Sequence, residues 1–199
     1  MQESKPKILI ISSANPTSGP GMLANDSLVA FRQMGLEADL LTLNRIDIHH
    51  DFLYVQDNLT FWGQLRHKIS RLHPYYLRQR FFNKLQPKGS YGFFYREDQK
   101  PPVRSSEVLK KIKKNYDLVV IFFWQGMLSY RTIEEIYDKL HCVFRFNMVD
   151  YSPMSGGCHF TGNCESYQHA CGCCPAFESQ DPNDFTHQNV MYRERVLKK

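Results

Sequence analysis

The sequence predicts an α/β protein built on a Rossmann-like, doubly wound parallel sheet. Residues 7–12 (KILIIS) are a continuous aliphatic run between turn formers, which is typical of a strand buried on both faces. A glycine-containing loop, an amphipathic stretch and a second apolar run follow, and this order opens a doubly wound sheet. Residues 117–124 (DLVVIFFW) supply the clearest strand of the second half. The length of 199 residues fits one compact domain.

The first unit spans residues 7–43. After the loop at 13–21, apolar side chains recur at near-helical spacing and predict a helix with one apolar stripe. The members of this stripe are Met22, Leu23, Leu28, Phe31 and Met34. Gly35 stands where a C-cap glycine is expected, and residues 38–43 predict the second strand.

The second unit starts at Ser105 and alternates in the same way. Val108, Leu109 and Ile112 form an apolar stripe among lysines, which predicts a helix. The elements expected after it are a strand at 117–124, a helix at 129–140, a strand at 142–149 and a helix at 191–199.

The loop of Gly19, Pro20 and Gly21 lies between the first strand and the first helix, where backbone N–H groups and the helix dipole can face an anion. The loop contains neither a G-x-G-x-x-G pattern nor a Walker lysine, which argues against a P-loop. A phosphate-facing loop and an ordinary tight turn both stay open. Asn44 and Asp47 are the nearest candidates to bind a ribose after the second strand.

The net charge of +5 is concentrated in the segment 57–97, which holds eight Lys and Arg residues and no acidic residue between its two ends. Apolar residues recur on one helical face before Pro74 and again after it. They are Trp62, Leu65, Ile69, Leu72, Leu77, Phe81 and Leu85. Three interpretations stay open: surface helices packed on the sheet, helices that rest on an anionic membrane surface, and a nucleic-acid site, the least favoured of the three.

The segment 150–178 carries five of the six cysteines and almost no aliphatic residues, so it needs a metal ion or disulfides to hold it. Cys158, Cys164, Cys171 and Cys174 follow the spacing C-x5-C-x6-C-x2-C, and the closing C-x2-C pair can reach one tetrahedral ion. Four thiolates would close the coordination sphere, so such a zinc ion would be structural. Cys173, His159 and His169 are alternative ligands.

The compartment bears on these alternatives. No secretory signal precedes the first strand, and no apolar run approaches the roughly 20 residues of a membrane-spanning helix. We therefore expect a cytoplasmic protein, in which thiols stay reduced and clustered cysteines more often hold metal. Zinc, free thiols and disulfides all stay open at this point.

A block of residues within 150–175 resembles one found in bacterial family 4 glycosyltransferases, the GT-B enzymes of capsule, colanic-acid-type and O-antigen assembly. The matching residues are Asp150, Pro153, Gly156, Gly157, Cys158, Cys164, Cys171, Cys174 and Pro175. Trp124 and the loop 18–21 match the family in the same order along the chain. The chain departs from the family at Val149 and Phe123, where family members often carry His before the Asp and before the Trp.

The resemblance implies that residues 1–199 are the acceptor-side, N-terminal Rossmann-like half of a GT-B fold, with 150–178 as a Cys-rich loop insertion. The C-terminal nucleotide-sugar domain would lie outside this chain, and this half alone would be inactive. The implied reaction is retaining transfer of a sugar from a nucleotide-sugar to a saccharide acceptor linked to polyprenyl phosphate, without a catalytic cofactor.

The resemblance also implies roles for particular residues. Gly19 and Gly21 would face the donor pyrophosphate, Asp150 would be the catalytic residue at the cleft, and Trp124 would stack on a sugar. The segment 62–85 would rest on the inner face of the plasma membrane, so that the protein would be peripheral there.

Two competing interpretations come from the residues themselves. One is a non-enzymatic α/β module, stapled by zinc, that binds a protein or nucleic acid. The other is a flavodoxin-like or nucleotide-binding protein that uses the glycine loop, and the incomplete phosphate motif makes it the less favoured.

Overall fold

The computed structural model describes residues 5–17, 19–46, 51–57, 60–62, 65, 69, 92–93 and 103–198. Asp47 and most of the basic segment 57–97 lie outside the described residues. The structure therefore does not decide among the three interpretations of that segment. In the part of the chain that is described, no helix has the length and apolar character needed to cross a bilayer.

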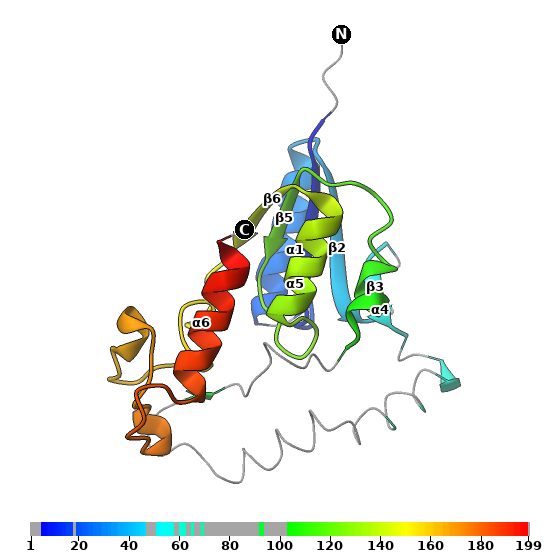
Figure 1. The fold of residues 1–199 in the computed structure, drawn as a ribbon. Coiled ribbons are helices and arrows are strands. Elements are labelled where there is room, and N and C mark those ends of the chain that lie inside the picture. The colour runs from blue at the N-terminus through cyan, green and yellow to red at the C-terminus, as the bar shows by residue number, and fades with distance from the viewer. Residues whose placement is uncertain are drawn as a thin grey trace.

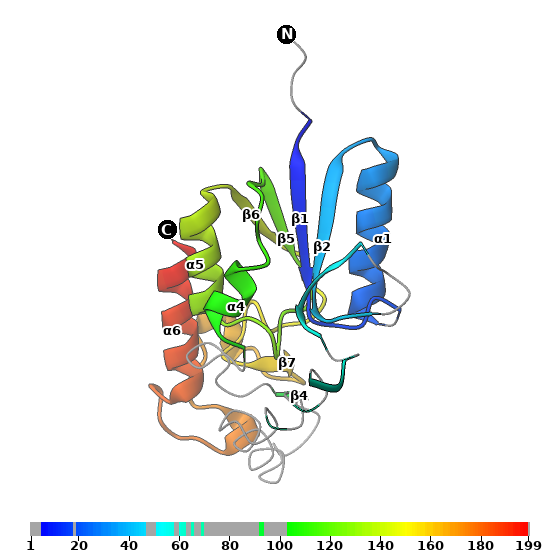
Figure 2. The same ribbon diagram turned by 90° about the vertical axis from the view of Figure 1, so that its right-hand side faces the viewer.

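A parallel sheet forms the centre of the molecule, and its order among the described strands is β3-β2-β1-β5-β6. These strands are β1 (Lys7–Ser12), β2 (Glu37–Asn44), β3 (Leu53–Gln56), β5 (Leu118–Ile121) and β6 (Val143–Phe146). Helix α1 (Pro20–Gln33) covers one face, whereas α4 (Ser105–Leu109) and α5 (Tyr130–Leu140) lie on the other, with α6 (Phe185–Leu197) beside α5 (Figures 1 and 2). The predicted Rossmann-like α/β sheet is confirmed.

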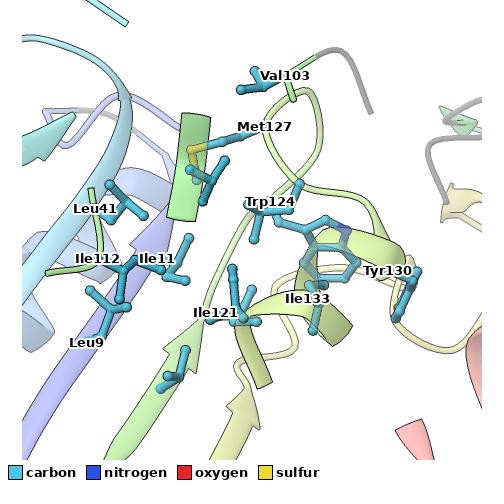
Figure 3. Packing of buried hydrophobic residues seen from close by; sticks show 14 of the residues in the cluster. Leu9, Ile11, Leu41, Val103, Ile112, Ile121, Trp124, Met127, Tyr130 and Ile133 are labelled. Atoms are coloured by element: carbon cyan, nitrogen blue, oxygen red, sulfur yellow. The ribbon is translucent and has the colours of Figure 1, made fainter. Parts of the chain in front are cut away.

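The central strand β1 explains why both faces must be covered. Ile8 and Ile10 pack in the cluster that includes Leu28 of α1. Leu9 and Ile11 belong to the opposite cluster, with Ile121, Ile133 and other side chains (Figure 3). Side chains alternate across a strand, so a strand with two apolar faces reads as an unbroken aliphatic run.

The apolar stripe predicted for α1 was wrong in part. Met22, Leu23 and Met34 are exposed, and the residues that α1 buries are Gly21, Ala24 and Leu28. The small residues at two of these positions let the helix approach the loop after β1 closely. A pattern judged by hydrophobicity alone favours the larger side chains.

Both ends of helix α5 are capped by the residues that flank it. Ser129 is the N-cap, and its Oγ accepts a hydrogen bond from the backbone N–H of Thr132. His141 closes the helix in the left-handed conformation. Strands β5 and β6 are shorter than the predicted 117–124 and 142–149, because the chain leaves the sheet after Ile121 and Phe146 to form the carboxyl edge.

The segment after β6 contains little regular structure. Strand β7 (Cys158–Phe160) pairs antiparallel with β4 (Gly92–Phe93), and two short 3₁₀ helices follow, η1 (Ser166–His169) and η2 (Pro175–Phe177). Helix α6 then runs beside the segment and α5 (Figure 1). The predicted final helix at 191–199 is therefore the second half of a helix that starts at Phe185.

Candidate functional site

The carboxyl edge of the sheet is the natural place for a site, because open α/β sheets bind ligands where the strand order reverses. That reversal lies at β1 and β5, which are neighbours although their connecting helices cover opposite faces. The loops after these two strands are tied together there. Ser13 donates its backbone N–H to the Phe123 carbonyl at 2.6 Å and its hydroxyl to the Gln125 carbonyl at 2.7 Å.

A cavity of about 320 Å³ opens beside this junction, between the loops that follow β1 and β2. Ser13, Asn15, Asn44 and Arg45 are among its lining residues. The Arg45 Nη1 lies 3.3 Å from the Asp57 carboxylate. The volume is at the lower end of what small-molecule sites have, and the lining supplies hydroxyl, amide and guanidinium groups for a polar ligand. Asn44, a predicted ribose contact, lies here.

Gly19 and Gly21 are both explained by backbone geometry. Gly19 caps α1 with a φ of 52°, in the left-handed region that favours glycine. A Cβ on Gly21 would overlap the carbonyl oxygen of Asn15, so only glycine lets α1 pack on the loop after β1. Neither residue lines the cavity, and their role toward a pyrophosphate stays a prediction.

Trp124 is part of the core. Its side chain is 3% exposed and packs edge to face against Tyr130, with ring centroids 6.0 Å apart (Figure 3). It packs in the same way against Phe146, whose ring centroid lies 5.5 Å away. In this structure its role is packing, because a sugar has no access to a ring so deeply buried. Stacking on a substrate would need the ring to become exposed, and it stays a prediction.

Asp150 follows β6 and pairs with His159, one of the alternative metal ligands predicted from the sequence. The Asp150 carboxylate accepts a hydrogen bond from the Ser152 backbone N–H at 2.7 Å through one oxygen. Its other oxygen lies 2.8 Å from the Nδ1 of His159. The Asp150 side chain is 1% exposed and that of His159 is 30% exposed. Of this pair, the imidazole is therefore the more exposed group.

The geometry of this pair has a chemical consequence. An ionised carboxylate only accepts hydrogen bonds, so the hydrogen of the bond belongs to Nδ1 of His159. In a neutral ring, Nε2 is then the proton acceptor. Edge-to-face contacts with Phe123 and Phe160, at 6.4 and 4.3 Å between centroids, hold the ring. His159 lies in β7, which returns beside the loop after β6, so no local sequence signal identifies its pairing with Asp150.

The four predicted cysteine ligands gather around one small cavity. Cys158, Cys164, Cys171 and Cys174 all line a space of about 20 Å³. None of the six cysteines forms a disulfide in this structure. Burial raises the pKa of Cys158 to about 12 and that of Cys174 to about 11. As the side chains stand, no three His, Cys, Asp or Glu residues among those described are arranged to hold a metal ion.

Helix α6 holds the cysteine segment by polar contacts. Asp184 caps the helix and also accepts the backbone N–H of Cys174 at 2.9 Å. Asn189 donates its side-chain amide to the Gly156 carbonyl at 2.9 Å. The guanidinium of Arg193 donates to the carbonyls of Pro153 and Ser155 and lies 5.0 Å from the Tyr130 ring centroid. Burial disfavours the charged form of Asp184, but hydrogen bonds, foremost from Thr186, outweigh it and lower its pKa.

Comparisons with protein-family models, with curated proteins and with solved structures found no match to the chain.

Proposed function

We propose that the chain is the acceptor-side domain of a retaining GT-B glycosyltransferase, of hexosyltransferase type, in cell-surface polysaccharide biosynthesis. The enzyme would transfer a sugar from a nucleotide-sugar to a saccharide acceptor linked to polyprenyl phosphate. The resemblance of the block 150–175 supports this proposal. The observation that carries it is the pair of His159 and Asp150, which follows β6 of a parallel sheet.

Within this proposal, His159 is the residue that meets the acceptor. Its Nε2 would accept the proton of the acceptor hydroxyl while that oxygen bonds to the anomeric carbon on the face from which the nucleoside diphosphate leaves. The nucleoside diphosphate takes the electrons of the broken C–O bond, and the configuration is retained. Asp150 would keep the ring in the required tautomer. Asp150, proposed from the resemblance as catalytic, thus becomes a positioning residue, because its carboxylate is buried. The chain departs from the family before Asp150, and His159 would supply the imidazole from the other side.

Exposed apolar side chains support a lipid-linked acceptor. Phe61 and Trp62 are 72% and 75% exposed, and Leu65 and Ile69 are exposed too. They belong to a segment with eight Lys and Arg residues and no acidic one between residues 58 and 96. Exposed aromatic residues among cations are suited to a membrane surface rich in anionic lipids.

Saturation-transfer NMR tests the acceptor assignment on the chain as it is. Short capsule-type oligosaccharides are expected to bind weakly and nucleotide-sugars not to bind measurably. His159→Gln should reduce the saccharide signal about tenfold, as the loss of one hydrogen bond worth about 1.4 kcal/mol does. His169→Gln, which changes an exposed histidine of the same segment, is the matched control. Tight nucleotide-sugar binding, or an equal loss in both variants, would contradict the proposal.

A second candidate function is a zinc-stapled module that binds nucleic acid, and the run of eight cations favours it. Phosphate neutralisation makes such binding fall steeply with salt. Binding to anionic vesicles in preference to single- or double-stranded oligonucleotides supports the transferase, and the reverse order with a steep salt slope supports the module.

A further inference from the structure

The cavity lined by cysteines collects its thiols from separate parts of the segment. Cys158 begins β7, Cys164 lies in the turn after β7, Cys171 follows η1, and Cys174 directly precedes η2. The remaining cysteine of the segment, Cys173, is exposed, and its thiol points instead to the Gln180 carbonyl, 3.6 Å away. The fold therefore selects four of five neighbouring cysteines for one space.

A backbone N–H group is directed at one of these sulfur atoms. The N–H of Gly156 donates to the Cys171 sulfur at 3.2 Å. A neutral thiol is a weak acceptor, whereas a thiolate bound to a metal accepts such bonds well, so this contact fits coordinated sulfur.

The backbone just before Cys174 is held in an unusual conformation. Four successive residues have positive φ: Ala170 at 68°, Cys171 at 59°, Gly172 at 96° and Cys173 at 45°. Each of the three non-glycine residues costs about 1–2 kcal/mol in this region. A Cβ on Gly172 would also overlap the carbonyl of Pro182. A run of this kind persists where the surroundings hold it firmly, and apolar packing is sparse here.

We propose that Cys158, Cys164, Cys171 and Cys174 bind one Zn²⁺ ion as a tetrahedral, structural tetrathiolate site. The cavity of about 20 Å³ is large enough for a particle the size of one water molecule. Rotation of the thiol side chains toward its centre would bring the sulfurs to about 2.3 Å from the metal.

Protons and charge balance as follows. Each thiol loses its proton to solvent when the ion binds, and four thiolates with Zn²⁺ leave a net charge of −2. The positive charge of the buried Arg193 guanidinium interacts electrostatically with Cys171 and would offset part of that negative charge. The site is independent of the proposed transferase activity, because it leaves no coordination position for a substrate.

Metal analysis of the whole chain, purified under reducing conditions, tests the proposal. We expect about one zinc per chain. Each of Cys158→Ser, Cys164→Ser, Cys171→Ser and Cys174→Ser should lower the zinc content or affinity at least about tenfold. Cys173→Ser, the same change in the same segment, should leave both as in the wild type. Cobalt substitution should give the intense visible absorption of a tetrahedral thiolate site.

A second measurement does not depend on whether the serine variants fold. Treating the unaltered chain with a strong chelator should make four additional thiols reactive toward an alkylating agent, and peptide mass spectrometry should place them at the four proposed positions. A chain that is free of zinc and cannot be loaded with it would overturn the proposal. So would bound iron, disulfides in the segment, or an equal loss of zinc in Cys173→Ser.

Discussion

The sheet around β1 and the segment from Asp150 to Asp184 differ in what fills the space between their backbones. In the sheet, Leu9, Ile10 and Ile11 are completely buried among other aliphatic and aromatic side chains. In the segment, the buried positions are held by serine and threonine hydroxyls, cysteines and a capping carboxylate. The sheet is stabilised by the removal of apolar surface from water, which needs no particular geometry. The segment depends on individual directional contacts.

This difference predicts how each region responds to change. A sheet core loses stability in proportion to the volume removed from it. In a segment held by hydrogen bonds and a proposed metal ion, substitutions at the few residues that make these contacts should lower stability strongly, and substitutions at the other positions should have little effect.

The largest effect is expected in the sheet. Ile10→Ala removes a fully buried side chain between β1 and α1 and should lower the free energy of unfolding by about 2–5 kcal/mol. Met22→Ala, on the exposed side of α1, is the control and should change it by about 0.5 kcal/mol or less. Urea unfolding measures both. Similar losses in the two variants would mean that the apolar face of α1 has been wrongly assigned.

An intermediate effect is expected where α6 meets the segment. Asp184→Ala removes the N-cap of α6 and leaves the Cys174 N–H without its acceptor, which should cost about 1–3 kcal/mol. Asp181→Ala, at an exposed carboxylate three residues earlier, should cost clearly less. Hydrogen exchange should show faster exchange across α6 in the first variant only. Unchanged protection across α6 in Asp184→Ala would mean that the N-cap does not contribute to the stability of the segment.

The smallest effect concerns a polar contact at the amino edge of the sheet. The hydroxyl of Tyr116 donates to the Asp39 carboxylate at 2.7 Å, and Tyr116→Phe should cost about 1 kcal/mol. Burial, together with that bond, raises the pKa of Tyr116. The contribution is therefore full below the ordinary tyrosine pKa of about 10 and decreases as pH rises above it.

Chemical denaturation at increasing alkaline pH checks the sign of this contribution. The wild type should lose more stability than Tyr116→Phe between neutral and strongly alkaline pH, so that the two curves converge. Curves that stay parallel would contradict a raised pKa.

The sequence predicted four strands of the parallel sheet, because apolar runs of strand length mark them, but it did not predict β3. The run at 7–12 coincides with β1, and Gly35 lies just after α1 with a φ of 76°. The two-stranded pairing of β4 with β7 was missed, because strands of two and three residues show no periodicity and their pairing joins distant parts of the chain.

The candidate site was predicted less completely. The spacing of the cysteines identified the four that share a cavity, since spacing limits which thiols can meet. The pairing of His159 with Asp150 depends on a turn that brings positions nine residues apart together, and no local pattern shows this. The burial of Trp124 likewise depends on Tyr130 and Phe146, which follow it in the chain.

The position of α6 also determines when the segment can take shape during synthesis. Arg193 and Asn189 hold carbonyls of residues 153–156, yet the ribosome adds them after every cysteine. Chains fold from the N-terminus as they emerge, so the sheet can be complete while the segment is still open. For that interval five thiols are accessible together, and under the proposed zinc site metal and oxidant would compete for them before α6 closes over the segment.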